Sequence, residues 1–116
     1  MIQFLLYCIG DYLIQNDWMG LNKKKLTLKG ELACQIHCIT YSLPFLFIGS
    51  WKAVIAIYLS HYIIDRTNII GWFLAIRNFV FDTKNFGFAH DRPVFISFWL
   101  YIITDNIFHL ICNYLF

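Results

Sequence analysis

The sequence predicts an all-α fold: a polytopic membrane four-helix bundle with an additional interfacial helix around residues 69–81. Of its 116 residues, 59% are hydrophobic and 20% are aromatic, but only 14% are charged. Ordinary globular domains are about one quarter charged, so this chain has too few polar residues to cover itself in water. Long apolar segments recur along it, and the polar residues inside them repeat at helical spacing. The length allows one domain.

Four spans are predicted, at residues 2–19, 30–48, 51–65 and 94–116. The first ends at a lysine cluster, and Pro44 is expected to kink the second or end its regular hydrogen bonding. Gly49 and Ser50 form the turn before the third span, which is short enough to be a buried or re-entrant helix instead. Pro93 suits the first turn of the fourth and longest span. Residues 69–81 are aromatic and contain one arginine, which favours an interfacial helix or a continuation of the third span.

The basic residues predict the orientation of these spans. Lysines cluster between the first two spans, and four further basic residues lie between the third and fourth. Because short loops rich in Lys and Arg stay in the cytoplasm, both termini are expected outside it. The alternative is a very hydrophobic soluble helical protein that buries its excess apolar surface in an oligomer. No basic helix face of the kind that binds nucleic acid is present.

Polar pairs four residues apart are the strongest functional signal. Such pairs lie on one face of a helix, and ionisable groups retained inside apolar segments are usually functional. One pair falls in each predicted span: Asp11/Gln15, His37/Tyr41, His61/Asp65 and Asp105/His109. In a helical bundle, such stripes meet in the core and assemble metal sites.

The expected ligands of a divalent metal are therefore three aspartates and three histidines. Imidazole together with carboxylate suits zinc, manganese or iron. A metal-activated water would be the nucleophile, with an aspartate or a histidine as the general base. The candidate ligands are Asp11, His37, His61, Asp65, Asp105 and His109, of which Asp11, Asp65 and Asp105 are the candidate catalytic residues. For any single position the alternative is a hydrogen bond between helices.

Further residues have supporting roles in this hypothesis. The expected hydrogen-bond partners of the ligands are Gln15, Tyr41 and Asn106. Lys23, Lys24 and Lys25 can attract an anionic headgroup or substrate, although setting the topology explains them equally well. Four cysteines lie in apolar segments without a CxxC pair, which favours buried free thiols. His90 and Asp91 lie in a polar loop, where solvation is the simpler explanation.

The string Gly-Asp-Tyr-Leu-Ile-Gln at residues 10–15, followed by Trp18, resembles an uncharacterised family of small integral-membrane proteins of bacteria and phages. That family's pattern continues with His-x-x-Ile-Asp and Asp-Gln-x-x-His, which residues 61–65 and 105–109 resemble, with Asn106 in place of Gln. The resemblance implies a multi-pass protein of the bacterial inner membrane. The family in turn resembles membrane-bound metal-dependent hydrolases, but its members often carry a Lys near the position of Asn68 here.

Three functions follow from these patterns. The leading hypothesis is a membrane-embedded metal-dependent hydrolase that acts on a lipid or a lipid-linked phosphate. The second is a non-catalytic phage-type membrane effector, holin-like or host-interfering, that oligomerises. The third is a proton or ion conductor that uses the Asp/His stripe as a relay. Membrane lipid is the expected partner, with a homo-oligomer as the alternative and no nucleic acid.

Overall fold

The computed structural model describes residues 1–115, which are helical with turns and contain no strand. The order of elements is α1 (Ile2–Cys8), the π-helix η1 (Ile9–Ile14), α2 (Asp17–Asn22), α3 (Leu28–Ser42), the 3-10 helix η2 (Leu43–Phe47), α4 (Trp51–Arg66), α5 (Ile69–Arg77) and α6 (Val94–Leu115). The chain divides into two compact units, Met1–Thr67 with His109–Phe116, and Asn68–Phe108.

Short polar signals set the starts of three helices in the first unit. The side chain of Asn16 accepts a hydrogen bond from the Met19 amide and caps α2. Thr27 caps α3 in the same way, and Ser50 caps α4. Each of these side-chain oxygens satisfies a backbone donor that the helix itself leaves unpaired. At the other end of α3, the helix tightens into η2, which has Pro44 in its first turn.

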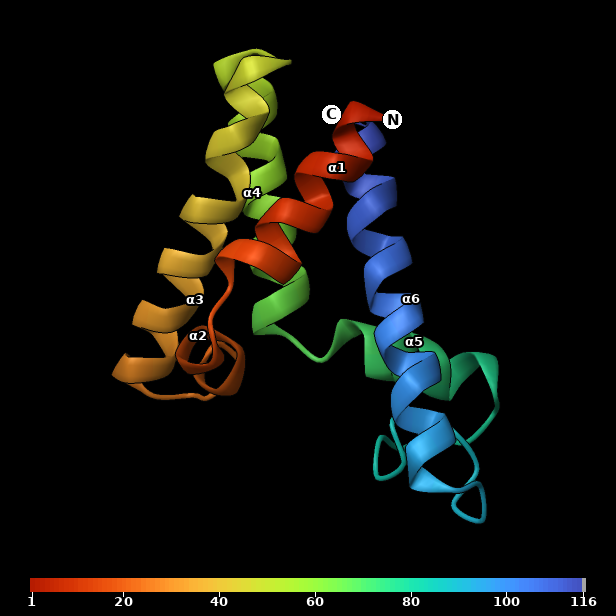
Figure 1. Cartoon of the computed structure of the whole chain (residues 1–116). Coiled ribbons are helices and arrows are strands. Elements are labelled where there is room, and N and C mark those ends of the chain that lie inside the picture. The colour runs from red at the N-terminus through yellow and green to blue at the C-terminus, as the bar shows by residue number, and fades with distance from the viewer. Residues whose placement is uncertain (116) are drawn as a thin grey trace. The chain divides into compact units, whose positions relative to one another are not determined.

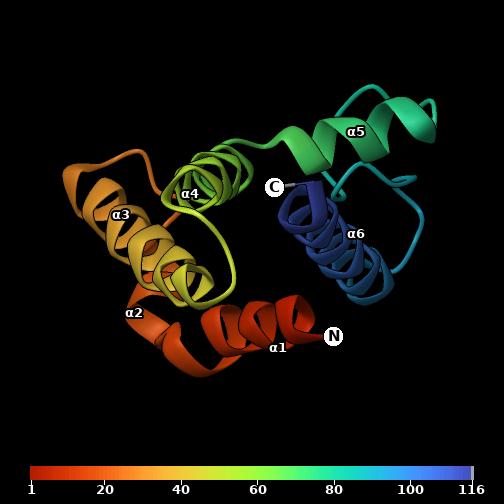
Figure 2. The same ribbon diagram turned by 90° about the horizontal axis from the view of Figure 1, so that it is seen from above.

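In the first unit, α3 and α4 lie side by side and α2 packs against α3 (Figure 1 and Figure 2). Its hydrophobic core consists of Tyr7, Tyr41, Phe45 and Ile57. Leu6, Cys8, Val54 and Leu110 pack around this core, so the last turns of α6 belong to the same unit. Two buried tyrosines thus lie in the core, next to the segments that carry the candidate ligands.

The second unit contains α5, the connection to α6 and the first turns of α6. The ring of Phe86 packs against those of Phe98 and Tyr101, with centroids 5.6 and 5.5 Å away. Gly87 has a φ of +84°, a conformation that favours glycine, and a Cβ there would lie 2.5 Å from the Gly71 carbonyl oxygen. A close turn of the connection against α5 therefore requires Gly87. The predicted helix 69–81 ends earlier than expected, at Arg77.

The predicted polytopic four-helix membrane bundle is wrong, and so are the multi-pass location in the inner membrane and the topology with both termini outside. Only α6 among the described helices is long and apolar enough to cross a membrane. The expected span at 2–19 is broken because Gln15 is extended, with ψ of 121°, and Asn16 starts a new helix. The 16 residues of α4 rise about 24 Å, less than the roughly 30 Å of a hydrocarbon core.

The exterior of the molecule is nevertheless apolar. Large hydrophobic side chains are about half exposed or more along α6, among them Phe95, Trp99, Ile103 and Ile111. α1 and α4 also expose such side chains. The excess of apolar residues in the composition therefore lies on the outside as well as in the cores.

Candidate metal centre

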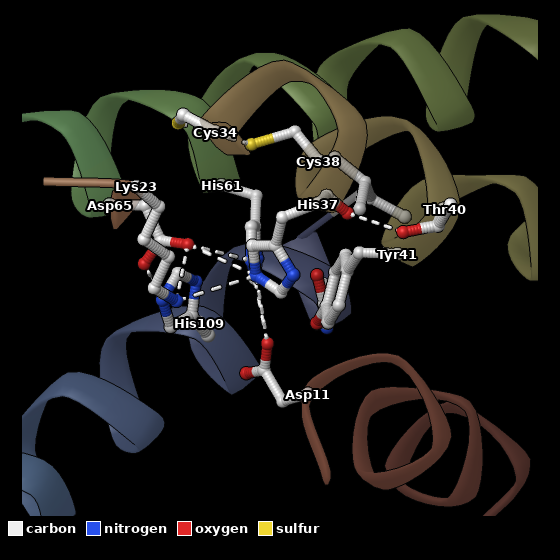
Figure 3. A network of polar contacts seen from close by, with 12 residues as sticks. Asp11, Lys23, Cys34, His37, Cys38, Thr40, Tyr41, His61, Asp65 and His109 are labelled. Atoms are coloured by element: carbon white, nitrogen blue, oxygen red, sulfur yellow. Dashed lines mark hydrogen bonds and ion pairs between the residues drawn. The ribbon is translucent and has the colours of Figure 1, made fainter. Parts of the chain in front are cut away.

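Five of the six predicted metal ligands converge in the first unit, from four different segments (Figure 3). Asp11 comes from η1, His37 from α3, His61 and Asp65 from α4, and His109 from the end of α6. The two histidines of α3 and α4 are almost fully buried, as are Asp65 and His109, whereas the side chain of Asp11 is 12% exposed. Helical spacing places His61 and Asp65 on one face of α4, one turn apart.

The centre of the cluster is the pair formed by His37 and His61, whose Nε2 atoms lie 2.8 Å apart. Asp65 Oδ2 lies 3.1 Å from His37 Nε2 and 3.3 Å from His61 Nε2. Asp11 Oδ1 approaches the same two nitrogen atoms, at 3.2 and 3.6 Å. Around a tetrahedral ion with bonds of about 2.1 Å, neighbouring ligand atoms lie about 3.4 Å apart, and around an octahedral one about 3.0 Å. The observed spacings therefore suit a metal centre.

His109 is the fifth member of the cluster, and its Nε2 lies 3.4 Å from Asp65 Oδ1. Two overlapping groups can each hold a metal ion, one of Asp11, His37 and His61 and one of His61, Asp65 and His109. The buried His/Asp groups of this chain could thus hold a metal ion. That the ion is divalent, as zinc, manganese or iron, stays a prediction.

Neighbouring rings pack against His61 and hold its imidazole in place. The ring of Tyr41 stacks on that of His61 with centroids 3.7 Å apart, and the His109 ring lies 4.0 Å from His61 on centroids. Asn113 donates a hydrogen bond to the hydroxyl of Tyr41, which fixes the tyrosine in turn. Gly10 makes room for this stack, since a Cβ there would lie 2.4 Å from Tyr41 Cδ2. The glycine before Asp11 therefore allows η1 to approach α3 closely.

Burial and neighbouring charges shift the pKa values of His61 and His37 in opposite directions. Burial and the neighbouring His109 lower the pKa of His61 to about 4, against the pull of the nearby carboxylates. Burial also lowers the pKa of His37, but contact with Asp11 and Asp65 outweighs it and raises that pKa above the ordinary value. His61 is therefore neutral at pH 7, whereas contact with the two carboxylates favours the protonated form of His37.

Both carboxylates are ionised in this setting. Burial raises the pKa of the Asp65 carboxyl, but His61, His109 and His37 together hold it well below the usual range. For Asp11, burial again opposes ionisation, and contact with His37 and the positive charges nearby bring its pKa below the ordinary value. The Oδ1 atoms of both aspartates are buried and accept no aligned hydrogen bond within residues 1–115. Such oxygens are suited to a cation.

Sequence reasoning missed the role of Lys23, whose Nζ lies 2.8 Å from Asp65 Oδ2. Lys24 and Lys25, which the sequence grouped with it, are exposed. No sequence signal separates the three lysines, because the contact depends on how the loop after α2 returns to α4.

The remaining predicted residues lie elsewhere. Asp105 and Asn106 are half-buried on α6, one turn before His109, and belong to the second unit. The Oε1 atom of Gln15 is buried and makes no hydrogen bond with the described part of the chain, and the supporting role of Gln15 stays a prediction. The four cysteines are free, and Cys34 and Cys38 contact each other through their sulfur atoms, 3.8 Å apart.

Comparison of the chain with protein-family models, with curated proteins and with solved structures found no match. The resemblance to small membrane proteins of bacteria and phages therefore stays an expectation.

Proposed function

We propose that this protein is a metal-dependent hydrolase whose divalent ion is held by His37, His61 and Asp65. The convergence of two Nε2 atoms and one carboxylate oxygen within 2.8–3.3 Å of one another, all buried, carries the proposal. Three protein ligands with an open position are typical of catalytic zinc sites. Zinc, manganese and iron all accept this ligand set. A bound ion would lower the pKa of a water molecule and so supply the nucleophile.

Asp11 is the general base in this proposal. It is the most exposed of the clustered carboxylates, and it lies on a π-helix, a rare element often found at functional sites. Its carboxylate accepts a proton from the attacking water, whose oxygen bonds to the electrophilic atom of the ester. The bond to the leaving alcohol breaks, and Asp11 returns the proton to that alcohol. His109 Nε2 lies 3.4 Å from the other carboxylate oxygen of Asp65, Oδ1, so it can join as a further ligand of the same ion.

The metal content of purified protein tests this proposal, together with turnover of chromogenic phosphate and carboxylate esters. We expect one or two metal ions per chain, a loss of metal in His61→Ala and Asp65→Asn, and retention in His90→Ala. His90 is a matched control, because it is an exposed histidine paired with Asp82 in the second unit. Asp11→Asn should keep the metal but lose turnover by about 10²–10⁴-fold, the range for a general base.

Two outcomes would overturn the proposal. The first is wild-type protein that contains no metal and takes up none on titration. The second is an Asp11→Asn variant with full turnover, which would remove its role as base. A metal-free protein that arrests bacterial growth would instead favour the non-catalytic effector.

We further propose membrane lipid as the partner of the apolar exterior. α6 exposes apolar side chains along 22 residues, and the first unit has an open apolar groove of about 550 Å³ lined in part by Ile14, Leu43 and Phe47. Large exposed apolar patches mark interaction sites, and each of these two surfaces is of that kind. We expect the protein to float with phospholipid vesicles in a density gradient. Oligomers that stay at the bottom of the gradient would favour self-association instead.

A further inference from the structure

Lys23 occupies a cation position inside the ligand cluster. Its Nζ lies 2.8 Å from Asp65 Oδ2 and 3.4 Å from His37 Nε2, two of the atoms assigned above to the metal (Figure 3). Its side chain is only 14% exposed, in contrast to the exposed lysines that follow it. The ammonium therefore neutralises Asp65 from the position where an ion would bind.

The backbone of Lys23 is held in place by the residue next to Asp65. Arg66 donates from Nη1 to the carbonyl oxygen of Lys23, at 3.1 Å, and from Nε to Glu31 Oε2, at 2.9 Å. Glu31 also accepts a hydrogen bond from Tyr62, so the guanidinium itself has a fixed partner. The contact between Glu31 of α3 and Arg66 of α4 therefore fixes the position of the Lys23 backbone.

A second contact fixes the same loop against α3. At Gly30 a Cβ would lie 2.0 Å from the Lys25 carbonyl oxygen and 2.8 Å from that of Asn22. The loop backbone therefore presses directly on the helix, where no larger residue fits. The side chain of Lys23 takes no part in this backbone contact, so it can move without disturbing the packing.

A metal ion and this ammonium compete for one carboxylate oxygen. The Lys23 ammonium contacts Asp65, and the His37 imidazole contacts the carboxylates of both Asp65 and Asp11. A divalent ion would supply positive charge to the same carboxylates from one point. Since like charges a few ångströms apart repel in a buried site, the ammonium has to leave Asp65 when the ion binds.

We propose that Lys23 is an internal cation that metal displaces, and that the displaced ammonium then binds a phosphate oxygen of the substrate. The inference rests on the proposed hydrolase and names its substrate class, a phosphate ester. Lysine binds phosphate as a mobile point charge, and the anchored backbone keeps its ammonium within a side chain's length of the ion. Asp11, the proposed base, approaches the same two histidine nitrogen atoms, so a phosphate held by the ion and Lys23 would lie on the side of the cluster that it serves.

Metal and phosphate titrations of Lys23→Met test both halves of this inference. We expect the variant to bind zinc or manganese about tenfold more tightly than wild type, because the competing charge is gone. The metal-loaded variant should bind inorganic phosphate at least tenfold more weakly. Lys29→Met, which removes an exposed lysine from α3, should change neither affinity.

Vesicles with and without phosphatidic acid distinguish the source of the phosphate. Metal-dependent binding to the anionic vesicles that exceeds binding of inorganic phosphate, and that is lost in Lys23→Met, would assign a lipid headgroup. Tighter binding of inorganic phosphate would assign a soluble ester. Either result supports the inference.

A second measurement needs no variant and remains valid if Lys23→Met fails to fold. Acylation of lysines in the wild-type protein, read by mass spectrometry, should be slow at Lys23 without metal and about tenfold faster with it, while Lys29 stays unchanged. A protein that binds no metal would overturn both the hydrolase and this inference. Two outcomes would overturn this inference alone, provided that the protein binds metal. The first is a rate of Lys23 acylation that metal does not change, and the second is an unchanged phosphate affinity in Lys23→Met.

Discussion

The stability of the metal-free protein should fall between pH 7 and pH 5 because of His61. The pKa of this buried histidine is lowered from 6.5 to about 4 in the folded state. In the unfolded state it returns to about 6.5, so between these values the unfolded chain binds more protons than the folded one. The stabilisation is complete above pH 6.5 and is lost as pH falls toward 4.

The magnitude follows from the gap between the two states. A difference of about 2.5 pH units corresponds to about 3 kcal/mol over the whole window, of which about 2 kcal/mol is lost between pH 7 and pH 5. The raised pKa of His37 acts oppositely, but only above 6.5, where its contribution is lost as pH rises. The lowered pKa values of Asp11 and Asp65 act below about 4. Among these four groups, His61 therefore causes most of the change in stability between pH 6.5 and pH 4.

Urea unfolding in the presence of a chelator, followed by circular dichroism, measures this loss. The free energy of unfolding typically falls by about 2 kcal/mol per M urea. The urea concentration at the unfolding midpoint should therefore be about 1 M lower at pH 5 than at pH 7. The variant His61→Gln is expected to be less stable at both pH values but to show little of the shift. A wild-type midpoint that stays constant or rises, or a variant that shifts as much as wild type, would refute the assignment of a neutral buried His61.

Three further predictions concern the packing and the metal. Gly10→Ala should destabilise the protein by about 1–3 kcal/mol in thermal unfolding, because its Cβ would lie 2.4 Å from the buried ring of Tyr41; Gly20→Ala, whose nearest contact is 3.4 Å away, is the control and should show no loss. Tyr41→Phe should cost about 1–3 kcal/mol, since it leaves the buried amide of Asn113 without its acceptor, and an unchanged melting temperature would contradict that contact. Chelation of protein held at a free metal concentration of 100 times Kd should remove about 2.7 kcal/mol of stability, and a melting curve that ignores the chelator would contradict metal binding to the folded state.

Part of this structure could be read from the sequence because it depends on local spacing. His61 and Asp65 share a face of α4 simply because they are four residues apart, and Pro44 marks the end of the regular α3. The same spacing rule failed to predict the break in the helix at Gln15 and Asn16. Asp11, Gln15 and Trp18 continue a helical stripe, so the extended residue and the capping role of Asn16 were read as helix interior.

The membrane prediction failed for a related reason. Composition reports how much apolar surface a chain has, but not the length of each unbroken helix, and crossing a membrane depends on length. Lys23 was beyond sequence reasoning because its contact with Asp65 spans 42 positions and depends on how Arg66 fixes the loop. The pair Asp105/His109 shows that a shared helix face does not bring both residues to the same cluster, since only His109 belongs to a candidate ligand group.

The arrangement of charges explains how a buried Asp/His cluster can persist with or without an ion. Removing one partner from a buried ion pair is strongly destabilising, because it leaves an uncompensated charge. Here Lys23 and His37 contact the carboxylates of Asp65 and Asp11, and a divalent ion would compensate the same carboxylates. The ligand set therefore does not depend on metal to fold, and chelation should weaken the protein without unfolding it. Loss of metal in His61→Ala, a ligand variant that removes no charge from the cluster, then reports on the site itself.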